Sequence, residues 1–131
     1  MIYADANVII RLLEGDAATR APLEARLFSL KGTAGFFHTS RLSWLECRIK
    51  PLRANDSKLL ALYDAFFASA DVTMVELTRP VVERATDLRA GLNVKTPDAL
   101  HLASAICSGV TAFLTGDKGL AKCKDVPVEV L

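Results

Sequence analysis

Residues 1–10 read MIYADANVII. Within this mainly apolar run, Asp5 carries the one charge and Asn7 the one amide. A carboxylate is costly inside an apolar core unless it is paired or holds a metal ion. The pattern predicts a buried strand over Met1–Ala4 that ends where Asp5 emerges, and another part of the chain has to compensate the charge of Asp5.

The composition is that of a globular chain. At 131 residues, the simplest prediction is a single domain over residues 1–131 with a substantial core. Hydrophobic residues make up 51% and charged residues 24%, which argues against disorder. The formal net charge of +1 excludes a strongly basic nucleic-acid binder but leaves local basic patches open.

Cysteine usage and hydropathy bear on the compartment. Cys47, Cys107 and Cys123 lie far apart with no CxxC pair, which indicates neither a disulfide framework nor a zinc site. Asp5 interrupts the N-terminal apolar run, so no signal peptide is predicted. The apolar stretch 99–114 is too short to cross a membrane. We expect a cytoplasmic protein with no membrane partner.

Short β-type runs alternate with helical patterns along the chain. Strands are predicted over 1–4, 35–40, 72–78, 111–115 and 126–131, and helices over 7–13, 17–30, 41–50, 57–68, 80–90 and 97–107, with a helical turn at 118–123. Pro51 is expected to stop the third helix, and Gly91 and Gly109 to close the last two. Strands separated by helices predict an α/β sandwich around a parallel sheet.

Four acidic residues occupy similar positions in this pattern. Asp5 and Asp117 follow predicted strands directly. Glu46 lies on the helix after the 35–40 strand, and Asp98 lies at the start of a helix after Thr96 and Pro97. In an open parallel sheet, ligands bind outside the carboxyl ends of the strands, where residues remote in sequence converge. The four carboxylates could therefore meet at one edge.

Taken singly, two of the acids have simple structural explanations. Glu46 could complete a capping box with Ser43, although a helix that starts after Ser40 would place Glu46 well inside it. Asp117, in the segment TGDKG, could be a turn residue or the cap of the next helix. Neither residue alone indicates a site.

The remaining two acids differ in how easily structure explains them. Asp98 suits the first turn of a helix with Thr96 as its cap and Pro97 at its first position. Asn7 could cap the first helix, and Asp5 would then still be unexplained. Asp5 is therefore the acid that most needs a functional reason.

Considered together, the acids favour a divalent cation. Carboxylate oxygens are the hard ligands that Mg²⁺ or Mn²⁺ requires. Four carboxylates at one edge would repel one another and raise their pKa values unless a cation were bound. The pattern therefore predicts a Mg²⁺ site, with Mn²⁺ as an alternative ion.

In these segments the sequence resembles the PIN-domain nucleases, and most closely the VapC-type toxins of prokaryotic toxin–antitoxin pairs. The ordered matches are YADANVII, TSRLSWLE, TPDALHLASA and FLTGDKGL, which together cover nearly the whole chain. The resemblance implies a three-layer α/β/α fold with Asp5, Glu46, Asp98 and Asp117 as the catalytic, metal-binding residues. By analogy, it also implies three supporting polar residues: Asn7, Ser40 and Thr115.

The resemblance implies a specific reaction and two partners. A Mg²⁺-dependent endoribonuclease would hydrolyse RNA phosphodiester bonds and leave a 5′-phosphate and a 3′-hydroxyl. A cognate antitoxin protein would bind the enzyme as the toxin of a type II pair. Two departures from the family, Ala6 in place of Thr or Ser and the missing acid after Asp117, favour one tightly bound ion over two.

Other side chains could assist or have ordinary structural roles. Five cations could hold an RNA backbone or simply be solvated: Arg11, Arg41, Arg48, Lys95 and Lys118. His101 shares a helical face with Asp98, and we expect it, like His38, to be a packed or hydrogen-bonding histidine. The segment Leu59–Phe67 and Trp44 are expected to be core, although they could also form a homodimer or antitoxin surface.

Two other functions remain open from the sequence. An aspartyl-phosphate enzyme could use Asp5 as its nucleophile, but it would want a second acid where Asn7 stands and a well-placed lysine. A catalytically silent interaction module would keep the fold without needing its acids, and here all four acids are present. The nuclease hypothesis explains more residues than either alternative.

Overall fold

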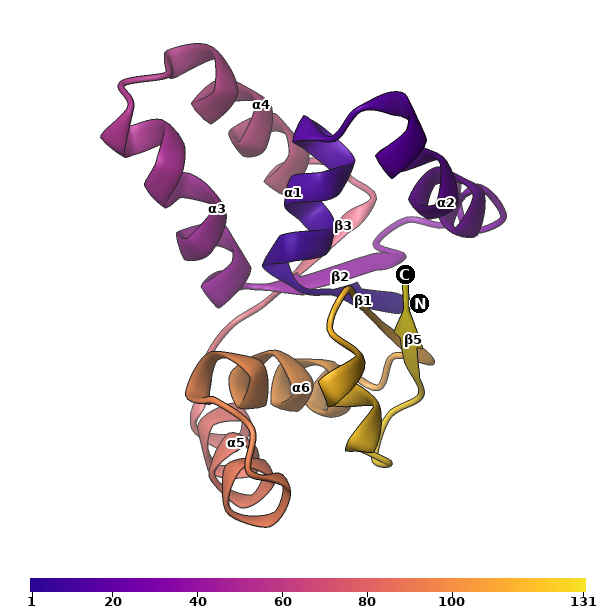
Figure 1. Ribbon diagram of the computed structural model, residues 1–131, viewed down its shortest axis with the longest axis vertical. Coiled ribbons are helices and arrows are strands. Elements are labelled where there is room, and N and C mark those ends of the chain that lie inside the picture. Colours follow the sequence, from indigo (N-terminus) through magenta and orange to yellow (C-terminus); the bar gives the residue numbers. More distant parts are fainter.

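The structure is a computed structural model that describes residues 1–131 as an α/β/α sandwich of three layers (Figure 1). Its middle layer is one parallel sheet with the strand order β3-β2-β1-β4-β5. The strands are β1 (Ile2–Ala4), β2 (Phe37–Ser40), β3 (Val72–Val75), β4 (Ala112–Thr115) and β5 (Val128–Val130). The predicted three-layer fold with a parallel sheet is confirmed.

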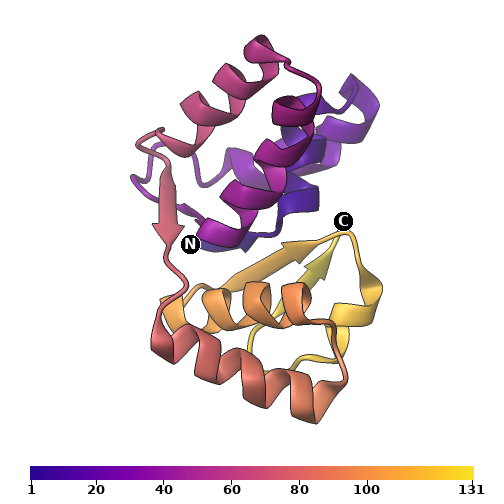
Figure 2. The same ribbon diagram turned by 90° about the vertical axis from the view of Figure 1, so that its left-hand side faces the viewer.

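Six helices cover the two faces of this sheet. They are α1 (Ala6–Glu14), α2 (Ala17–Phe28), α3 (Arg41–Arg53), α4 (Ser57–Phe67), α5 (Arg79–Leu92) and α6 (Thr96–Ser108), and a 3-10 turn, η1, spans Lys118–Lys122. Helices α1 to α4 lie on one face, and α5 and α6 lie on the other (Figures 1 and 2). None of them is long and apolar enough to span a bilayer.

The alternation of side chains along β1 and β4 creates two cores. Tyr3 and Phe113 point toward α5 and α6, where their rings stack with centroids 5.3 Å apart. Ile2, Ala4 and Leu114 point to the opposite face, into the core under α1 to α4. Because neighbouring residues of a strand face opposite sides, one short central strand serves both cores.

The apolar stripe of α4 packs largely as expected. Tyr63 is fully buried, and Leu59, Phe66 and Phe67 pack against the core on the α1 to α4 face. Leu62 departs from this pattern, since 47% of its surface remains exposed. The core interpretation of this stripe is therefore confirmed for its inner residues.

The order of the strands determines where a ligand can bind. The chain winds from β1 to β2 and β3 on one side and then crosses to β4 and β5 on the other. The winding direction therefore reverses between β1 and β4, both of which end at the same edge of the sheet. Such a switch point, outside the carboxyl ends of the strands, is where open α/β sheets bind ligands.

Several predicted element ends differ from the structure, and two of these differences have a clear physical reason. Pro51 does not stop α3, which continues to Arg53, because the proline ring is buried against neighbouring residues and this packing offsets one missing backbone hydrogen bond. The strand predicted over 72–78 ends at Val75, because its neighbour β2 ends at Ser40 and offers no further backbone partner. Thr78 occupies the N-cap position of α5.

The two glycines expected to close the last helices behave differently. Gly109 follows α6 in the left-handed conformation (φ 70°), as expected. Gly91 lies inside α5, which closes instead at Asn93 (φ 53°). Asparagine tolerates this conformation because its short polar side chain hydrogen-bonds locally, so the helix can run past Gly91.

Alanine substitutions at the two glycines should therefore have opposite effects on stability. A Cβ at either position meets no atom within 4 Å, so only the backbone conformation differs. Gly91→Ala should raise the free energy of unfolding by about 0.5–1 kcal/mol because alanine favours the helix. Gly109→Ala should lower it by about 1–2 kcal/mol because alanine disfavours a positive φ. Urea denaturation measures both; a loss of stability in Gly91→Ala would contradict the helical assignment of that residue.

Candidate functional site

Asp5 lies at the carboxyl end of the central strand and caps α1. Its side chain is nearly buried, with 7% of the residue exposed, and its Oδ1 accepts a hydrogen bond from the Val8 amide at 3.1 Å. The prediction that Asn7 could cap this helix is wrong, because the extended backbone of Asp5 already brings its carboxylate over the helix terminus. Asn7 is exposed in the first turn of α1 and makes no hydrogen bond to the four acids.

Thr115 links the ends of β1 and β4. Its buried hydroxyl donates to Asp5 Oδ2 at 2.7 Å and accepts from the Asp117 amide at 3.1 Å. Asp117 follows two residues later, is exposed, and caps η1 by accepting from the Gly119 amide at 2.8 Å. One hydroxyl therefore sets the spacing between two of the acids at the switch point.

Asp98 lies in the first turn of α6, facing the same edge. The prediction that Thr96 caps this helix is wrong, because Lys95 holds the cap position and Thr96 is already helical. The pKa of Asp98 is raised by partial burial and then by the negative charge of Asp117, with smaller contributions from Asp5 and Glu46. His101 opposes this shift. The structure thus brings all four acids into one electrostatic neighbourhood around Asp98.

Glu46 reaches this neighbourhood from the inside of α3. Helix α3 begins directly after Ser40, whose buried hydroxyl caps it by accepting from the Ser43 amide at 3.4 Å. Glu46 is therefore not part of a capping box. Its Oε1 accepts from His101 Nε2 at 2.7 Å, and His101 Nδ1 lies 2.7 Å from the Tyr3 hydroxyl. His101 is a hydrogen-bonding histidine, as expected.

The donor set of this edge fits a hard divalent cation. Asp5, Glu46, Asp98 and Asp117 supply carboxylate oxygens, although in this arrangement no three acidic, histidine or cysteine side chains lie close enough together to hold an ion between them. Mg²⁺ commonly keeps several waters and uses only one or two carboxylates directly. An open set of acids whose charges repel one another has the chemistry that such a hydrated ion requires.

Two of the five candidate cations are already neutralised. Arg41 pairs with Glu76, Arg48 pairs with Asp64, and both guanidinium groups lie over the Trp44 ring, at 5.4 and 4.5 Å from its centroid. These contacts account for Trp44, which is half-buried on α3. They also leave little free positive charge on this side of the acids.

The other three cations form no ion pair and lie next to the acids in sequence or space. Lys95 directly precedes α6, and Lys118 directly follows Asp117. The Arg11 guanidinium packs over Gly116, where an added Cβ would lie 2.2 Å from Nη2, and donates to the Leu131 carbonyl at 2.9 Å. Uncompensated positive charge therefore borders the Asp98 and Asp117 side of the edge.

Several polar groups near the site can be excluded from its chemistry. The three cysteines form no disulfide, and burial raises the pKa of Cys47 to about 12, so its thiol is not a ready nucleophile. His38 is half-buried in β2, and burial lowers its pKa. The His38 ring forms no hydrogen bond with the acids, which fits a structural role.

The role of Tyr3 was not predicted from the sequence. The period-two pattern of β1 directs Tyr3 to the α6 face, and a buried tyrosine hydroxyl requires a hydrogen-bond partner. His101 is a possible hydrogen-bond partner for this hydroxyl, and it shares a helical face with Asp98. These two facts were available in the sequence, but the pairing of β1 with α6 was not.

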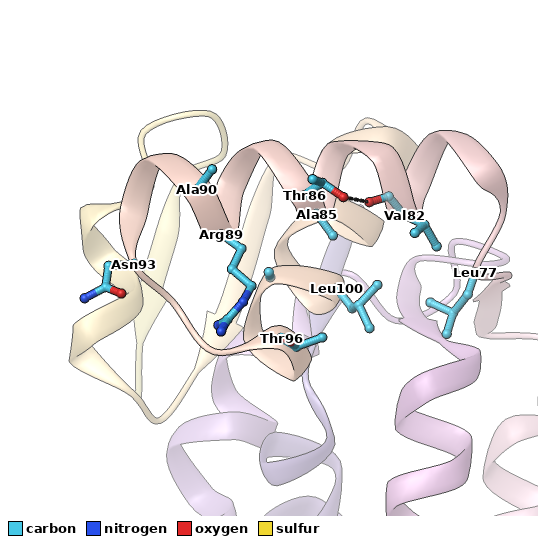
Figure 3. A pocket seen from close by; sticks show the side chains of 10 residues that line it. Leu77, Val82, Ala85, Thr86, Arg89, Ala90, Asn93, Thr96 and Leu100 are labelled. Carbon is cyan, nitrogen blue, oxygen red and sulfur yellow. Dashed lines mark hydrogen bonds between the residues drawn. The ribbon is translucent and has the colours of Figure 1, made fainter.

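An apolar groove between α5 and α6 is separate from the acids (Figure 3). Leu77, Val82 and Leu100 line it, and Arg89 is its one charged residue. The Arg89 guanidinium donates to the Val94 carbonyl at 2.7 Å, which fastens the loop between the two helices. The groove contains none of the predicted site residues.

The fold and this edge define a class of protein: an α/β domain with clustered carboxylates at the switch point of a parallel sheet. The family model of the PIN domain matches residues 2–126. The chain belongs to the PIN domain family. No curated protein sequence matches it.

Solved structures show the same fold at low sequence identity. A toxin–antitoxin complex from Klebsiella pneumoniae matches with a TM-score of 0.72 and 21% identity, over 96% of this chain and 95% of that one. The VapBC2 complex from Rickettsia felis, bound to a promoter DNA fragment, matches with a TM-score of 0.78 and 13% identity, over 99% of this chain and 98% of that one. VapC20 of Mycobacterium tuberculosis, a toxin that cleaves the sarcin–ricin loop, matches with a TM-score of 0.71 and 20% identity, over 93% of this chain and 94% of that one.

Removing the charge of Asp98 should stabilise the metal-free protein. A raised carboxyl pKa means that folding disfavours the ionised form, so the penalty is present above the folded pKa and fades as the pH falls through it. Asp98→Asn should therefore be more stable than the wild type at pH 7 in EDTA, and this gain should shrink toward pH 4.

Denaturation with urea at several pH values measures this effect. Asp87→Asn is the matched control, because Asp87 is an exposed acid on α5 outside the site and the substitution changes the charge equally. An equal gain in both variants would indicate a general charge effect and would contradict the local repulsion.

Proposed function

We propose that this protein is a Mg²⁺-dependent endoribonuclease that acts as the toxin of a type II toxin–antitoxin pair. The observation that carries the proposal is that the charges of Asp117, Asp5 and Glu46 all act on Asp98 at the switch point of a PIN domain. Carboxylates that repel one another destabilise a fold unless a cation binds between them, so the protein should have a use for that cation. Phosphodiester hydrolysis with a divalent ion is such a use.

The four acids would hold the ion, with Mn²⁺ able to replace Mg²⁺. When bound, the ion supplies Lewis-acid activation of water and of the phosphoryl oxygens. Asp5 is well suited to orientation, because Val8 and Thr115 restrict both of its oxygens. Asp98, whose pKa is raised in the absence of a cation, is the acid whose ionised form a bound cation would stabilise most clearly.

The distribution of cations supports a nucleic-acid backbone as ligand. Arg11, Lys95 and Lys118 provide unpaired positive charge beside the acids, which would attract phosphates. VapC20 cleaves the sarcin–ricin loop, and its shared fold supports RNA as the substrate class. The RNA backbone would then run along the Asp98 and Asp117 side of the pocket.

An antitoxin is the proposed protein partner. Two of the solved relatives are toxin–antitoxin complexes, and this supports binding of a cognate antitoxin by the present chain. Exposed apolar residues such as Leu45, Leu52 and Leu62 on α3 and α4 are available for such contacts or for a homodimer. A reducing cytoplasm is the proposed location, in keeping with three free cysteines.

The aspartyl-phosphate alternative lacks the cation that it needs. No lysine or arginine forms an ion pair with Asp5, and Asn7 is exposed rather than joined to it. A nucleophilic Asp5 would have no charged partner from the chain to neutralise an incoming phosphoryl group. A silent interaction module remains as an outcome of the experiment below.

Purified protein should cleave RNA with Mg²⁺ or Mn²⁺, and Asp5→Asn should not. We expect the variant to lose roughly a hundredfold or more in rate, because the amide replaces a charge held at the centre of the site. Cleavage of a mixed pool of labelled RNA, with the 5′ ends of the products analysed for phosphate, measures this.

Asp87→Asn again serves as the control, since it alters an exposed acid remote from the pocket and should cleave at the wild-type rate. Equal cleavage by wild type and Asp5→Asn would indicate a contaminating nuclease or a different site. No cleavage of any RNA by a folded wild type would favour the silent module.

Arg11 should contribute to RNA binding more than Arg41 does. In the inactive Asp5→Asn background, Arg11→Gln should reduce the dependence of log K on log salt by about 0.7 for each lost single-strand phosphate contact. Arg41→Gln should leave that slope unchanged because Glu76 already neutralises Arg41. Fluorescence anisotropy across a salt series measures both slopes; equal losses would contradict the assignment of the backbone path.

A further inference from the structure

A buried chain of hydrogen bonds connects three elements at the carboxyl edge. The Tyr3 hydroxyl on β1 lies 2.7 Å from His101 Nδ1 on α6, and His101 Nε2 lies 2.7 Å from Glu46 Oε1 on α3. Helices α3 and α6 cover opposite faces of the sheet (Figure 2). The chain therefore joins the two outer layers directly where the acids meet.

The chemistry of the groups determines which atoms donate. A carboxylate only accepts, so the proton between His101 and Glu46 belongs to His101 Nε2. In a neutral imidazole, Nδ1 is then an acceptor, and the Tyr3 hydroxyl must donate to it. Burial raises the pKa of Tyr3, which keeps its hydroxyl protonated for this purpose.

The inner end of the chain is held in place by packing. Tyr3 is fully buried, and its ring stacks on Phe113 with an angle of 9° between the ring planes. His101 is only 4% exposed and meets the Tyr3 ring edge-on. Rotating the imidazole would break its contacts with the Tyr3 hydroxyl and with Glu46 together, which is unfavourable in a buried environment.

The outer end is a glutamate that would otherwise be free to move. The Glu46 side chain is 34% exposed, and the hydrogen bond from His101 is its one contact of that kind with the chain. Its second oxygen, Oε2, accepts no hydrogen bond from the protein. A single anchored oxygen therefore leaves the other oxygen available to a ligand.

We propose that His101, oriented by Tyr3, is a positioning residue that holds the Glu46 carboxylate in one orientation for the cation pocket. The inference rests on the proposed function, because it concerns a carboxylate assigned to that pocket. It separates the roles of two residues on one helix face: Asp98 contributes charge, whereas His101 orients Glu46 by a direct hydrogen bond. Hydrogen-bonded partners of metal ligands commonly matter in this way.

Mn²⁺ affinity, measured by calorimetry or electron paramagnetic resonance, tests the inference without any RNA. His101→Leu should weaken Mn²⁺ binding about tenfold. His101→Gln, whose amide can donate from near the position of Nε2, should recover part of this loss. Tyr3→Phe keeps the buried ring and removes the donor to Nδ1, and it should weaken binding to a smaller extent.

A double-mutant cycle distinguishes positioning from general damage. In a Glu46→Gln background, adding His101→Leu should cause a much smaller further loss of Mn²⁺ affinity, because the carboxylate that His101 orients is already gone. His38→Leu is the matched control, since His38 is half-buried in β2 outside the chain of hydrogen bonds, and it should bind Mn²⁺ like the wild type.

A spectroscopic readout tests the proposed proton positions in the wild type. Nitrogen-15 NMR of His101 should show a proton on Nε2 and an unprotonated, hydrogen-bonded Nδ1, and Tyr3→Phe should shift the Nδ1 resonance. A proton on Nδ1 would overturn the inference, even if His101→Leu failed to fold.

The remaining outcomes separate this inference from the proposed function. Equal Mn²⁺ affinity in the wild type and a folded His101→Leu would overturn the positioning role while leaving the nuclease proposal intact. The same loss from His101→Leu in both backgrounds would also overturn it. A wild type that bound no Mn²⁺ and cleaved no RNA would overturn the proposed function and the inference with it.

Discussion

One nearly buried carboxylate at the end of the central strand constrains the geometry of this molecule. Asp5 accepts hydrogen bonds from the first turn of α1 and from Thr115 at the end of β4. The first of these sets the start of α1, and the second ties β1 to the strand across the switch point. A short strand, a helix and a crossover therefore meet at one side chain, whose charge is balanced by amide and hydroxyl dipoles before any ligand is considered.

The other acids are arranged around this point at a cost in electrostatic energy. Asp98 has a raised pKa because burial and the charges of Asp117, Asp5 and Glu46 all disfavour its ionised form. Salt bridges neutralise acids and bases elsewhere, as in the two-pronged contact of Arg26 with Glu129 that ties α2 to β5. No such partner is supplied to Asp98, Asp117 or Asp5, so the fold keeps this edge negative while pairing charge at other places.

Sequence patterns predicted most helices and strands and the position of each acid relative to them. They failed at particular helix caps and helix ends. Asn7 and Thr96 have the chemistry of helix caps, but the helices start one residue after Asp5 and Lys95 because backbone conformation, not residue preference, sets a helix start. Pro51 would end an isolated helix, whereas here it is buried within α3. Propensity is a weak prior that tertiary packing overrides at such positions.

The order of apolar and polar residues was enough to predict the alternation of strands and helices and the parallel sheet, since these depend on local periodicity. It also placed Asp5, Glu46 and Asp117 at or just after the ends of three strands. Which side chains touch depended on packing across the sheet. Tyr3 meets His101 from 98 positions away, and His101 meets Glu46 across 55. Residues so far apart in the sequence come into contact only when α3 and α6 pack on opposite faces of β1 and β2. Local sequence patterns do not predict that packing.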